Sequence, residues 1–139
     1  MNDIIIRNFQ ESDHQEVVRL WREQLVQNRP YHDVNLSINR KVVFQPELFF
    51  VAEADGKVIG TAMGGYDGHR GWLYSVAVTD EYQRQGVATR LVLHLEEELR
   101  KLGCVKINLQ VEKGNAEAIA FWEALGWKIS DVVAMGKVM

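Results

Sequence analysis

The sequence is poor in the residues and segments that would cross-link a protein, anchor it in a membrane or direct it out of the cell. Its 139 residues include one cysteine and two prolines. A single cysteine excludes an intramolecular disulfide and favours a reducing compartment. No apolar run approaches the length of a membrane span, and the N-terminal stretch MNDIIIRNFQESD has no cleavage-site pattern. We therefore expect a cytoplasmic protein with no membrane contact.

Strong charge of one sign and the common nucleotide motifs are also missing. Sixteen Lys and Arg stand against 19 Asp and Glu, a net charge of −3, so no broad positive field is available to bind nucleic acid. There is no Gly-x-x-x-x-Gly-Lys-Ser/Thr loop, and no Gly-x-Gly-x-x-Gly follows a predicted strand. No ligand spacing predicts a metal site, and Cys104 has no His–Cys arrangement that would make it a nucleophile. We expect neither nucleic acid nor a metal as a partner.

We predict a single domain over residues 1–139, because the chain has the length of one domain and contains no repeat or linker. The spacing of apolar residues predicts its helices and strands. Predicted helices span 35–44, 87–102 and 115–124, and a first helix runs from a cap at Ser12 or Asp13 to near Gln27. Predicted strands span 3–7, 48–54, 57–66, 72–78 and 105–111, with two more in the tail 127–139. The pair Asp55-Gly56 predicts a tight hairpin turn. This order is typical of a mixed α/β (α+β) fold with an antiparallel meander.

The stretch EYQRQGVATRL, residues 81–91, connects a predicted strand directly to a predicted helix. The first amides of a helix lack intrahelical partners, and the helix dipole favours negative charge there. Gly86 and Ala88 keep this corner free of bulk, while Arg84 and Thr89 add donors. The corner therefore predicts an anion site that suits a diphosphate. Gly86 taken alone is equally compatible with a plain strand-to-helix turn.

The run Gln83-Arg84-Gln85-Gly86-Val87-Ala88 resembles the Gln/Arg-x-x-Gly-x-Gly/Ala signature of the GCN5-related N-acetyltransferases, the GNAT superfamily. VAVTDEYQRQGVATRL resembles the fourth strand and third helix of that family, and LQVEKGNAEAIAFWEALGW its closing motif. The resemblance covers essentially the whole chain and includes small bacterial members of the YpeA type. It implies a central, mostly antiparallel sheet flanked by helices, with splayed fourth and fifth strands.

The resemblance also implies acetyl-CoA as the cosubstrate. In the family, backbone groups of the splayed strand bind the pantetheine arm, as a peptide does when it adds to a sheet edge. On this chain those groups would come from Val76, Ala77 and Val78, and an amide near Val76 would bind the oxyanion. The implied contacts to the pyrophosphate come from Gln83, Arg84, Gln85, Gly86, Val87, Ala88 and Thr89.

Two residues of the closing motif are further candidates. The family counterpart of Asn115 reaches toward the cofactor arm, although Asn at a helix start is also a preferred cap. Trp122 stands where family members commonly have the tyrosine that protonates the departing thiolate, but an indole N–H is no practical acid and the residue is equally suited to a core. Tyr74 and Tyr82 are possible substitutes.

The residues that would bind the acceptor amine are indicated less clearly by the sequence. Tyr31, His32 and Asp33 lie in the loop where the family places acceptor contacts. Other titratable side chains stand at His69 and Asp67, in a predicted turn, and at Glu53, on a predicted strand. Each of these is also compatible with an ordinary solvated position.

Together these features predict an N-acetyltransferase that moves an acetyl group from acetyl-CoA to a primary amine, on a small molecule, a protein N-terminus or a lysine, by direct attack in a ternary complex. The alternatives are a non-catalytic acyl-CoA-binding sensor or interaction module, and a protein-interaction domain without a ligand. A homodimer that pairs the apolar C-terminal strands is possible.

Overall fold

The computed structural model describes residues 3–25 and 29–139. The chain divides into an N-terminal unit, Met1–Leu109, and a C-terminal unit, Gln110–Met139. The N-terminal unit contains the sheet and the helices α1, α2 and α3, and the C-terminal unit contains α4 (Ala116–Ala124). That these units form one domain stays a prediction.

The sheet has five strands in the order β1-β2-β3-β4-β5, which is also their order along the chain. They span Ile4–Asn8, Phe49–Ala54, Lys57–Tyr66, Gly71–Val78 and Ile107–Asn108. The first four strands pair antiparallel, and β5 pairs with β4 in parallel. The turn between β2 and β3 is at Asp55 and Gly56, which both have positive φ, as the sequence predicted. The mixed, mostly antiparallel sheet is confirmed.

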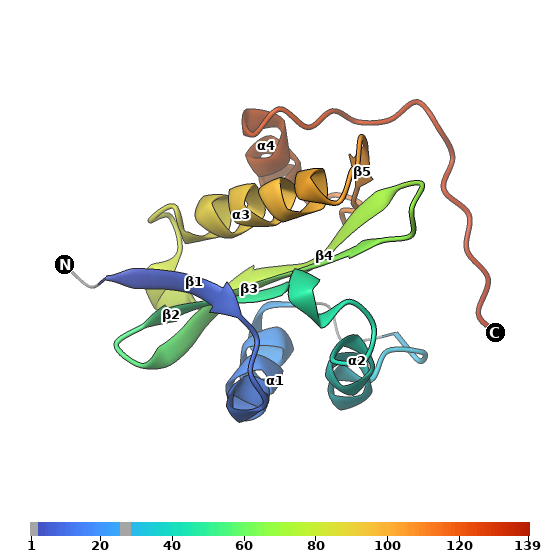
Figure 1. Cartoon of the computed structure of the whole chain (residues 1–139). Coiled ribbons are helices and arrows are strands. Elements are labelled where there is room, and N and C mark those ends of the chain that lie inside the picture. The colour runs from blue at the N-terminus through green and yellow to red at the C-terminus, as the bar shows by residue number, and fades with distance from the viewer. Residues whose placement is uncertain (1–2, 26–28) are drawn as a thin grey trace. The chain divides into compact units, whose positions relative to one another are not determined.

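Helices cover both faces of this sheet (Figure 1). They are α1 (His14–Gln24), α2 (Val34–Lys41) and α3 (Val87–Lys101). In Figure 1, α3 lies on one side of the sheet and α1 and α2 lie on the other. Each helix buries the apolar stripe that its spacing predicts, such as Leu91, Val92, Leu95 and Leu99 of α3.

The core between the sheet and α1 contains two stacked aromatic side chains among aliphatic ones. Trp21 stacks on Phe49 with ring centroids 5.8 Å apart, and both side chains are fully buried. Val34 and Ile38 of α2 belong to the same cluster. Burying such large side chains is the main favourable contribution to folding, so this core fixes α1 and α2 against β2 and β3.

On the opposite face, glycines in β3 let α3 approach the sheet closely. A Cβ at Gly64 would lie 2.8 Å from Leu95 Cδ1, and one at Gly60 would lie 3.1 Å from Leu91 Cδ1. A Cβ at either position would require these leucine side chains to move away from the sheet. The glycines that interrupt the strand pattern at these two positions therefore serve packing.

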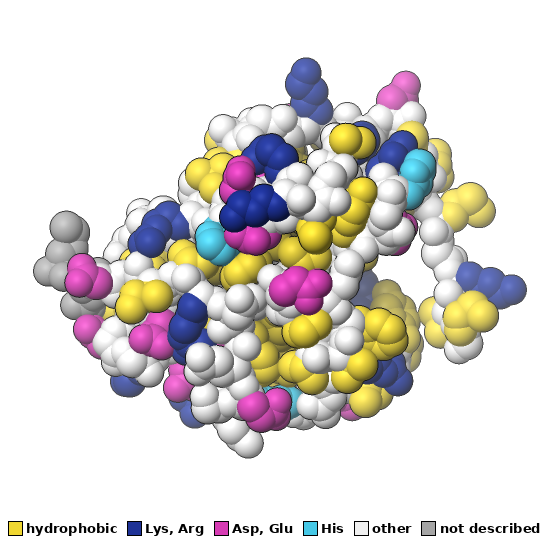
Figure 2. All heavy atoms as spheres, in the orientation of Figure 1, with side chains coloured by type: hydrophobic (Ala, Val, Ile, Leu, Met, Phe, Trp, Pro, Cys, Tyr) yellow, Lys and Arg dark blue, Asp and Glu magenta, His cyan; other side chains and the backbone are white. Residues whose placement is uncertain are grey.

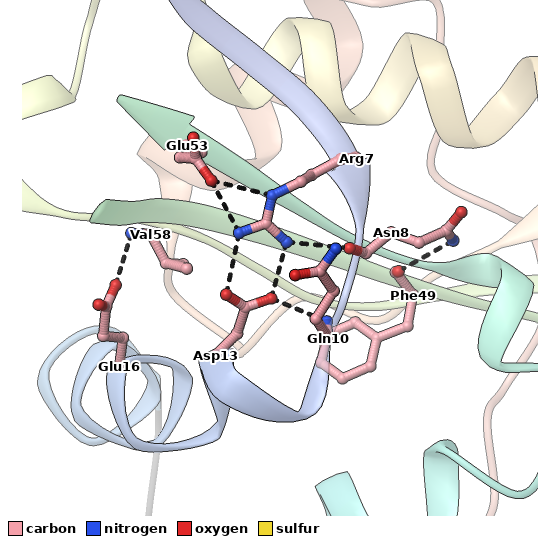
Figure 3. A network of polar contacts seen from close by, with 8 residues as sticks. All are labelled: Arg7, Asn8, Gln10, Asp13, Glu16, Phe49, Glu53 and Val58. Atoms are coloured by element: carbon pink, nitrogen blue, oxygen red, sulfur yellow. Dashed lines mark hydrogen bonds and ion pairs between the residues drawn. The ribbon is translucent and has the colours of Figure 1, made fainter. Parts of the chain in front are cut away.

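A polar network ties the start of α1 to the edge of the sheet (Figure 3). The Arg7 guanidinium donates to both carboxylate oxygens of Asp13, at 2.8 and 2.9 Å, and its Nε donates to Glu53 Oε1 at 3.0 Å. Asp13 also accepts the amide of Gln10 at 2.8 Å. Asp13 is thus at the N-cap of α1, as predicted, but its carboxylate does not accept from the amides of that helix.

Several element boundaries differ from the prediction. Helix α1 ends at Gln24, α2 ends at Lys41, and the predicted helix end at Gln27 lies outside the described residues. Strand β5 covers only Ile107–Asn108 of the predicted 105–111, because these two residues alone pair with β4. The two tail strands are wrong: residues 127–139 form no strand. A strand requires a partner strand, and the described C-terminal unit contains only α4.

Candidate cofactor and acceptor site

Strand β4 is paired with β5 only at its beginning. Gly71 and Trp72 pair with Ile107 and Asn108, and within the described residues Leu73–Val78 have no partner strand on that side. Gly71 permits the close start, because a Cβ there would lie 2.7 Å from Cys104 Sγ. Strand β5 ends at Asn108, so β4 continues past it without a partner on that side, as the predicted splay requires. A strand edge without a partner exposes backbone groups that a ligand can bind.

A β-bulge interrupts β4 beside this edge. Thr61 pairs with Ala77 and Met63 pairs with Tyr74, so Ser75 and Val76 together stand opposite one residue of β3. Ser75 has φ 52°, in the left-handed region. The Thr61 hydroxyl donates to the Ser75 carbonyl oxygen at 2.8 Å. This contact fixes the bulge that contains Val76, the predicted oxyanion donor.

The corner before α3 has the free amides that the sequence predicted. The first backbone bond of the helix runs from the Arg90 amide to the Gly86 carbonyl oxygen at 3.0 Å. In the described part of the chain, the amides of Val87, Ala88 and Thr89 find no acceptor. Gly86 has φ 81°, and a Cβ there would meet nothing within 4 Å. Its conformation, and not crowding, therefore favours glycine.

The two glutamines of this corner bind the protein's own backbone. Gln83 Nε2 donates to the Val78 carbonyl oxygen at 2.9 Å, and Gln85 Nε2 donates to that of Glu81 at 3.0 Å. Arg84, with φ 62°, is exposed and makes no ion pair among the residues described. The side-chain charge of Arg84 is therefore available to an anion, whereas the glutamines hold the loop in shape.

A cavity of ≈ 380 Å³ lies on the α1–α2 side of the N-terminal unit. It contains three predicted acceptor residues, Tyr31, His32 and Asp33, but not His69. The lining residues are Tyr31, His32, Asp33, Leu36, Ser37, Arg40, Lys41, Phe44, Gln45 and Met63. The seven residues from Leu36 onward were not predicted, although positions 36, 37, 40, 41 and 44 follow helical spacing and would share one face of the predicted helix 35–44.

Three polar side chains that line this cavity differ in their hydrogen bonding. The Asp33 carboxylate caps α2 by accepting the Leu36 amide at 3.0 Å. Lys41 Nζ donates to the Gly64 carbonyl oxygen, and burial lowers the pKa of Lys41 although Glu47 opposes this effect. His32 Nε2 is buried without a partner among the described residues. A buried polar nitrogen of this kind is a group that a ligand can satisfy.

Tyr74 lies between the bulge and the cavity. It pairs in register with Met63, a lining residue, so the two side chains share the face that carries α1 and α2. Its ring stacks on Trp72 at 6.4 Å and is 48% exposed. Burial, and to a smaller degree the charge of Asp67, raises the pKa of Tyr74, so its hydroxyl stays protonated at neutral pH.

Other candidates have structural partners. Asn115 caps α4 by accepting the Ala118 amide at 3.0 Å, and Trp122 contacts the rings of Phe121 and Trp127 at 5.0 and 5.2 Å within the C-terminal unit. Glu53 is paired with Arg7. Asp67 accepts the amides of His69 and Arg70, which hold its pKa below the ordinary value and close the β3–β4 turn.

Across residues 3–25 and 29–139, no helix has both the length and the apolar character needed to cross a bilayer. The same residues contain no cluster of three or more potential metal ligands. Tyr82, the second tyrosine considered as an acid, is half-buried in the short 3-10 turn before the corner.

Solved structures that resemble this chain include N-acetyltransferases. The splayed sheet with helices on both faces is the fold of known N-acetyltransferases. The ribosomal-protein-S18-alanine N-acetyltransferase of Escherichia coli superimposes with a TM-score of 0.73, at 27% identity over 89% of this chain and 77% of that one. An aminoglycoside N-acetyltransferase solved in complex with CoA shares the fold, with a TM-score of 0.79 at 19% identity over 99% and 96% of the two chains.

The family follows from the sequence match. Residues 4–127 match the acetyltransferase (GNAT) family. An acetyltransferase of Yersinia pestis is 42% identical over 132 residues, which are 95% of this chain and 93% of the relative. The chain therefore belongs to the acetyltransferase (GNAT) family.

Proposed function

We propose that this protein is an N-acetyltransferase that moves the acetyl group of acetyl-CoA to a primary amine of a small molecule or a protein. One observation carries the proposal: on the side of β5, Leu73–Val78 of β4 have no partner strand among the described residues, and β4 is followed by a helix whose first amides are free. An extended arm that ends in a phosphate ester fits both features at once.

The chain's own groups suit such a cosubstrate. The free amides of residues 87–89 and the exposed Arg84 would bind the diphosphate, and the backbone of Val76, Ala77 and Val78 would bind the pantetheine arm. The aminoglycoside N-acetyltransferase that was solved in complex with CoA has the same fold. The amide of Val76, in the bulge, would donate to the thioester oxygen as it becomes negative.

The reaction is a direct acyl transfer. The ammonium group of the acceptor first loses a proton to water or a base, because its pKa lies near 8 to 10 and only the neutral amine attacks. The amine nitrogen forms a bond to the acetyl carbon, the carbon–sulfur bond breaks, and the electron pair leaves with the CoA sulfur. The nitrogen loses a second proton, and the thiolate gains one.

The source of the thiolate's proton separates this chain from the common family pattern. Trp122 is no acid, whereas Tyr74, next to the bulge in β4, carries a hydroxyl that is protonated at neutral pH. Burial raises the pKa of Tyr74, which makes this hydroxyl a weaker acid than an exposed tyrosine. A thiol with a pKa of about 8.5 also leaves tolerably as the anion. We assign the proton to Tyr74, with water as the alternative donor.

Calorimetry with acetyl-CoA and a thiol-release assay test the proposal together. We expect micromolar binding of acetyl-CoA and thiol release that depends on an added amine, measured on a panel of amino acids, amines, polyamines, aminoglycosides and peptides with free N-termini. Binding without release on any acceptor would support the second candidate, a non-catalytic acyl-CoA sensor, which the tryptophan at position 122 favours. Absence of binding would refute both.

A further inference from the structure

The walls of the 380 Å³ cavity combine apolar surface with unpaired positive charge. Tyr31, Leu36 and Phe44 line it although they are 64%, 43% and 70% exposed to solvent. Figure 2 shows hydrophobic side chains gathered at the surface over the region of α2. Exposed apolar side chains grouped around a concavity are typical of a ligand site.

The cavity is lined by more basic than acidic side chains. Arg40 and Lys41 line it, against one carboxylate, Asp33. The Asp33 carboxylate caps α2 by accepting the Leu36 amide and keeps its negative charge, whereas Arg40 has no ion pair among the described residues. Lys41 donates to the Gly64 carbonyl oxygen, and Glu47, whose charge opposes the lowering of the pKa of Lys41 by burial, does not line the cavity. Two basic side chains against one carboxylate leave the lining with a net positive charge.

This charge distribution discriminates between acceptor classes. A polyamine or an aminoglycoside would bring several ammonium groups next to Arg40 and Lys41, and like charges at short range repel. An acceptor with a carboxylate would instead pair with a guanidinium, which binds carboxylates through two parallel hydrogen bonds. The volume lies at the small end of the range for ligand sites, which favours a small molecule.

The cavity is also close enough to the bulge for transfer. Met63 lines the cavity and pairs with Tyr74, and Val76 is two residues further along β4. Two residues of a strand span roughly 7 Å. The bulge shortens this span, so the wall of the cavity at Met63 lies next to Val76, and an amine bound at that wall would face a thioester held there.

We propose that the acceptor is a small aminocarboxylate with an apolar side group, of the α-amino-acid type, whose carboxylate is bound by Arg40 and Lys41. This inference rests on the proposed function and narrows its acceptor. In the transfer, the new bond joins the acceptor's amine nitrogen to the acetyl carbon, the thioester carbon–sulfur bond breaks, and the carboxylate is unchanged.

Matched acceptors test the carboxylate directly. Thiol release from acetyl-CoA is measured with phenylalanine, phenylalaninamide and phenethylamine, with the leucine series, and with spermidine and an aminoglycoside. We expect kcat/KM for the acids to exceed that for the amides by roughly 10- to 100-fold at equal amine concentration. Equal or faster release with the amides, with the polycations or with a peptide acceptor overturns the inference and leaves the transferase proposal standing.

Substitutions of Arg40 and Lys41 test whether these residues bind the carboxylate of the acceptor. Arg40→Gln should raise KM for the acids roughly tenfold and leave the amides unchanged, whereas the exposed Arg100→Gln on α3 should change neither. Lys41→Met is the second variant and should act in the same direction. An Arg40→Gln variant that retains full preference for the acids contradicts the assignment.

A binding measurement separates the two proposals. N-acetylphenylalanine is titrated into CoA-saturated protein and into its Arg40→Gln variant, beside its amide analogue. Binding that needs both the carboxylate and Arg40, without turnover of any acceptor, supports this ligand class and refutes the transferase. Binding of the amide analogue with equal affinity refutes the ligand class whatever the turnover.

Discussion

Trp21 Nε1 donates a hydrogen bond to Thr61 Oγ1 at 2.8 Å, and neither residue is exposed to solvent. The same hydroxyl donates to the Ser75 carbonyl oxygen at 2.8 Å. The core of α1 is thereby connected to the bulge of β4 through a single side chain. Because Ser75 has a left-handed φ, the bulge depends on contacts that hold it. Thr61 is thus a positioning residue for the Val76 amide.

Replacing Thr61 by valine should reduce turnover more than cosubstrate binding. The change keeps the shape but removes the donor to Ser75 and the acceptor of the Trp21 indole, so we expect kcat to fall by about tenfold or more. The dissociation constant of CoA should change less, by about threefold, because the diphosphate contacts at the corner before α3 are untouched and only the pantetheine contact at Val76 is affected. Stability should fall by about 1–3 kcal/mol. Thr61→Ser retains the hydroxyl and should recover kcat; equal losses of kcat in both variants would refute the positioning role.

Gly86→Glu should abolish CoA binding without unfolding the protein. The new carboxylate would stand at the free amides of residues 87–89 and repel the diphosphate, so we expect at least about a 100-fold weaker dissociation constant by calorimetry. Gly103→Glu is the matched control, since Gly103 also has positive φ and open space but stands beyond the other end of α3. Both variants should lose about 1–2 kcal/mol from backbone strain. Equal weakening of CoA binding in both would contradict the assigned anion site.

The sequence predicts those parts of the molecule whose signals are local. The helical spacing of Leu91, Val92, Leu95 and Leu99 defines α3, and the pair Asp55-Gly56 defines the β2–β3 turn, because both depend on neighbouring residues. The free amides before α3 follow from the same logic, since every helix start lacks partners for its first donors.

Features that depend on distant contacts could not be predicted. The bulge at Ser75 rests on hydrogen bonds across 40 and 14 positions of the chain. The tail is rich in apolar residues that suit a strand, yet Ile129 and Val133 are exposed, and the described C-terminal unit contains no strand with which the tail could pair. Of the residues that line the cavity, loop residues such as His32 are singled out by the family resemblance, whereas the face of α2 that carries Arg40 is not, because which residues border a cavity depends on tertiary packing. That acceptors bind in this cavity stays a prediction.

Tyr74→Phe should lower kcat while leaving the KM for acetyl-CoA near its original value. The Tyr74 hydroxyl is protonated at neutral pH, so its loss removes the proposed proton donor to the departing thiolate, although burial raises the pKa of Tyr74 and makes it a weaker acid. We expect a decrease on the order of tenfold, below the usual effect of a general acid because a thiolate leaves readily. Tyr82→Phe, in the 3-10 turn before the corner, should leave kcat unchanged. A larger effect at Tyr82 than at Tyr74 would reverse the assignment.

Asp13→Asn should destabilise the protein most near neutral pH and least in acid. Burial alone would raise the pKa of Asp13, but hydrogen bonds from Arg7 and the Gln10 amide outweigh it and hold this pKa below 3.8. Because the folded pKa is lower than the unfolded one, the carboxylate stabilises the fold above about pH 4 and loses that effect as the pH falls through the folded pKa. We expect a loss of about 2–3 kcal/mol at pH 7 by denaturant unfolding, since Glu53 still pairs with Arg7 (Figure 3). The difference in unfolding free energy between wild type and variant should shrink toward pH 3.

The control is Glu97→Gln, which breaks the exposed pair with Arg100 and should cost less than about 0.5 kcal/mol at either pH. A pH-independent loss in Asp13→Asn would mean that the side chain acts through its shape and not through its charge.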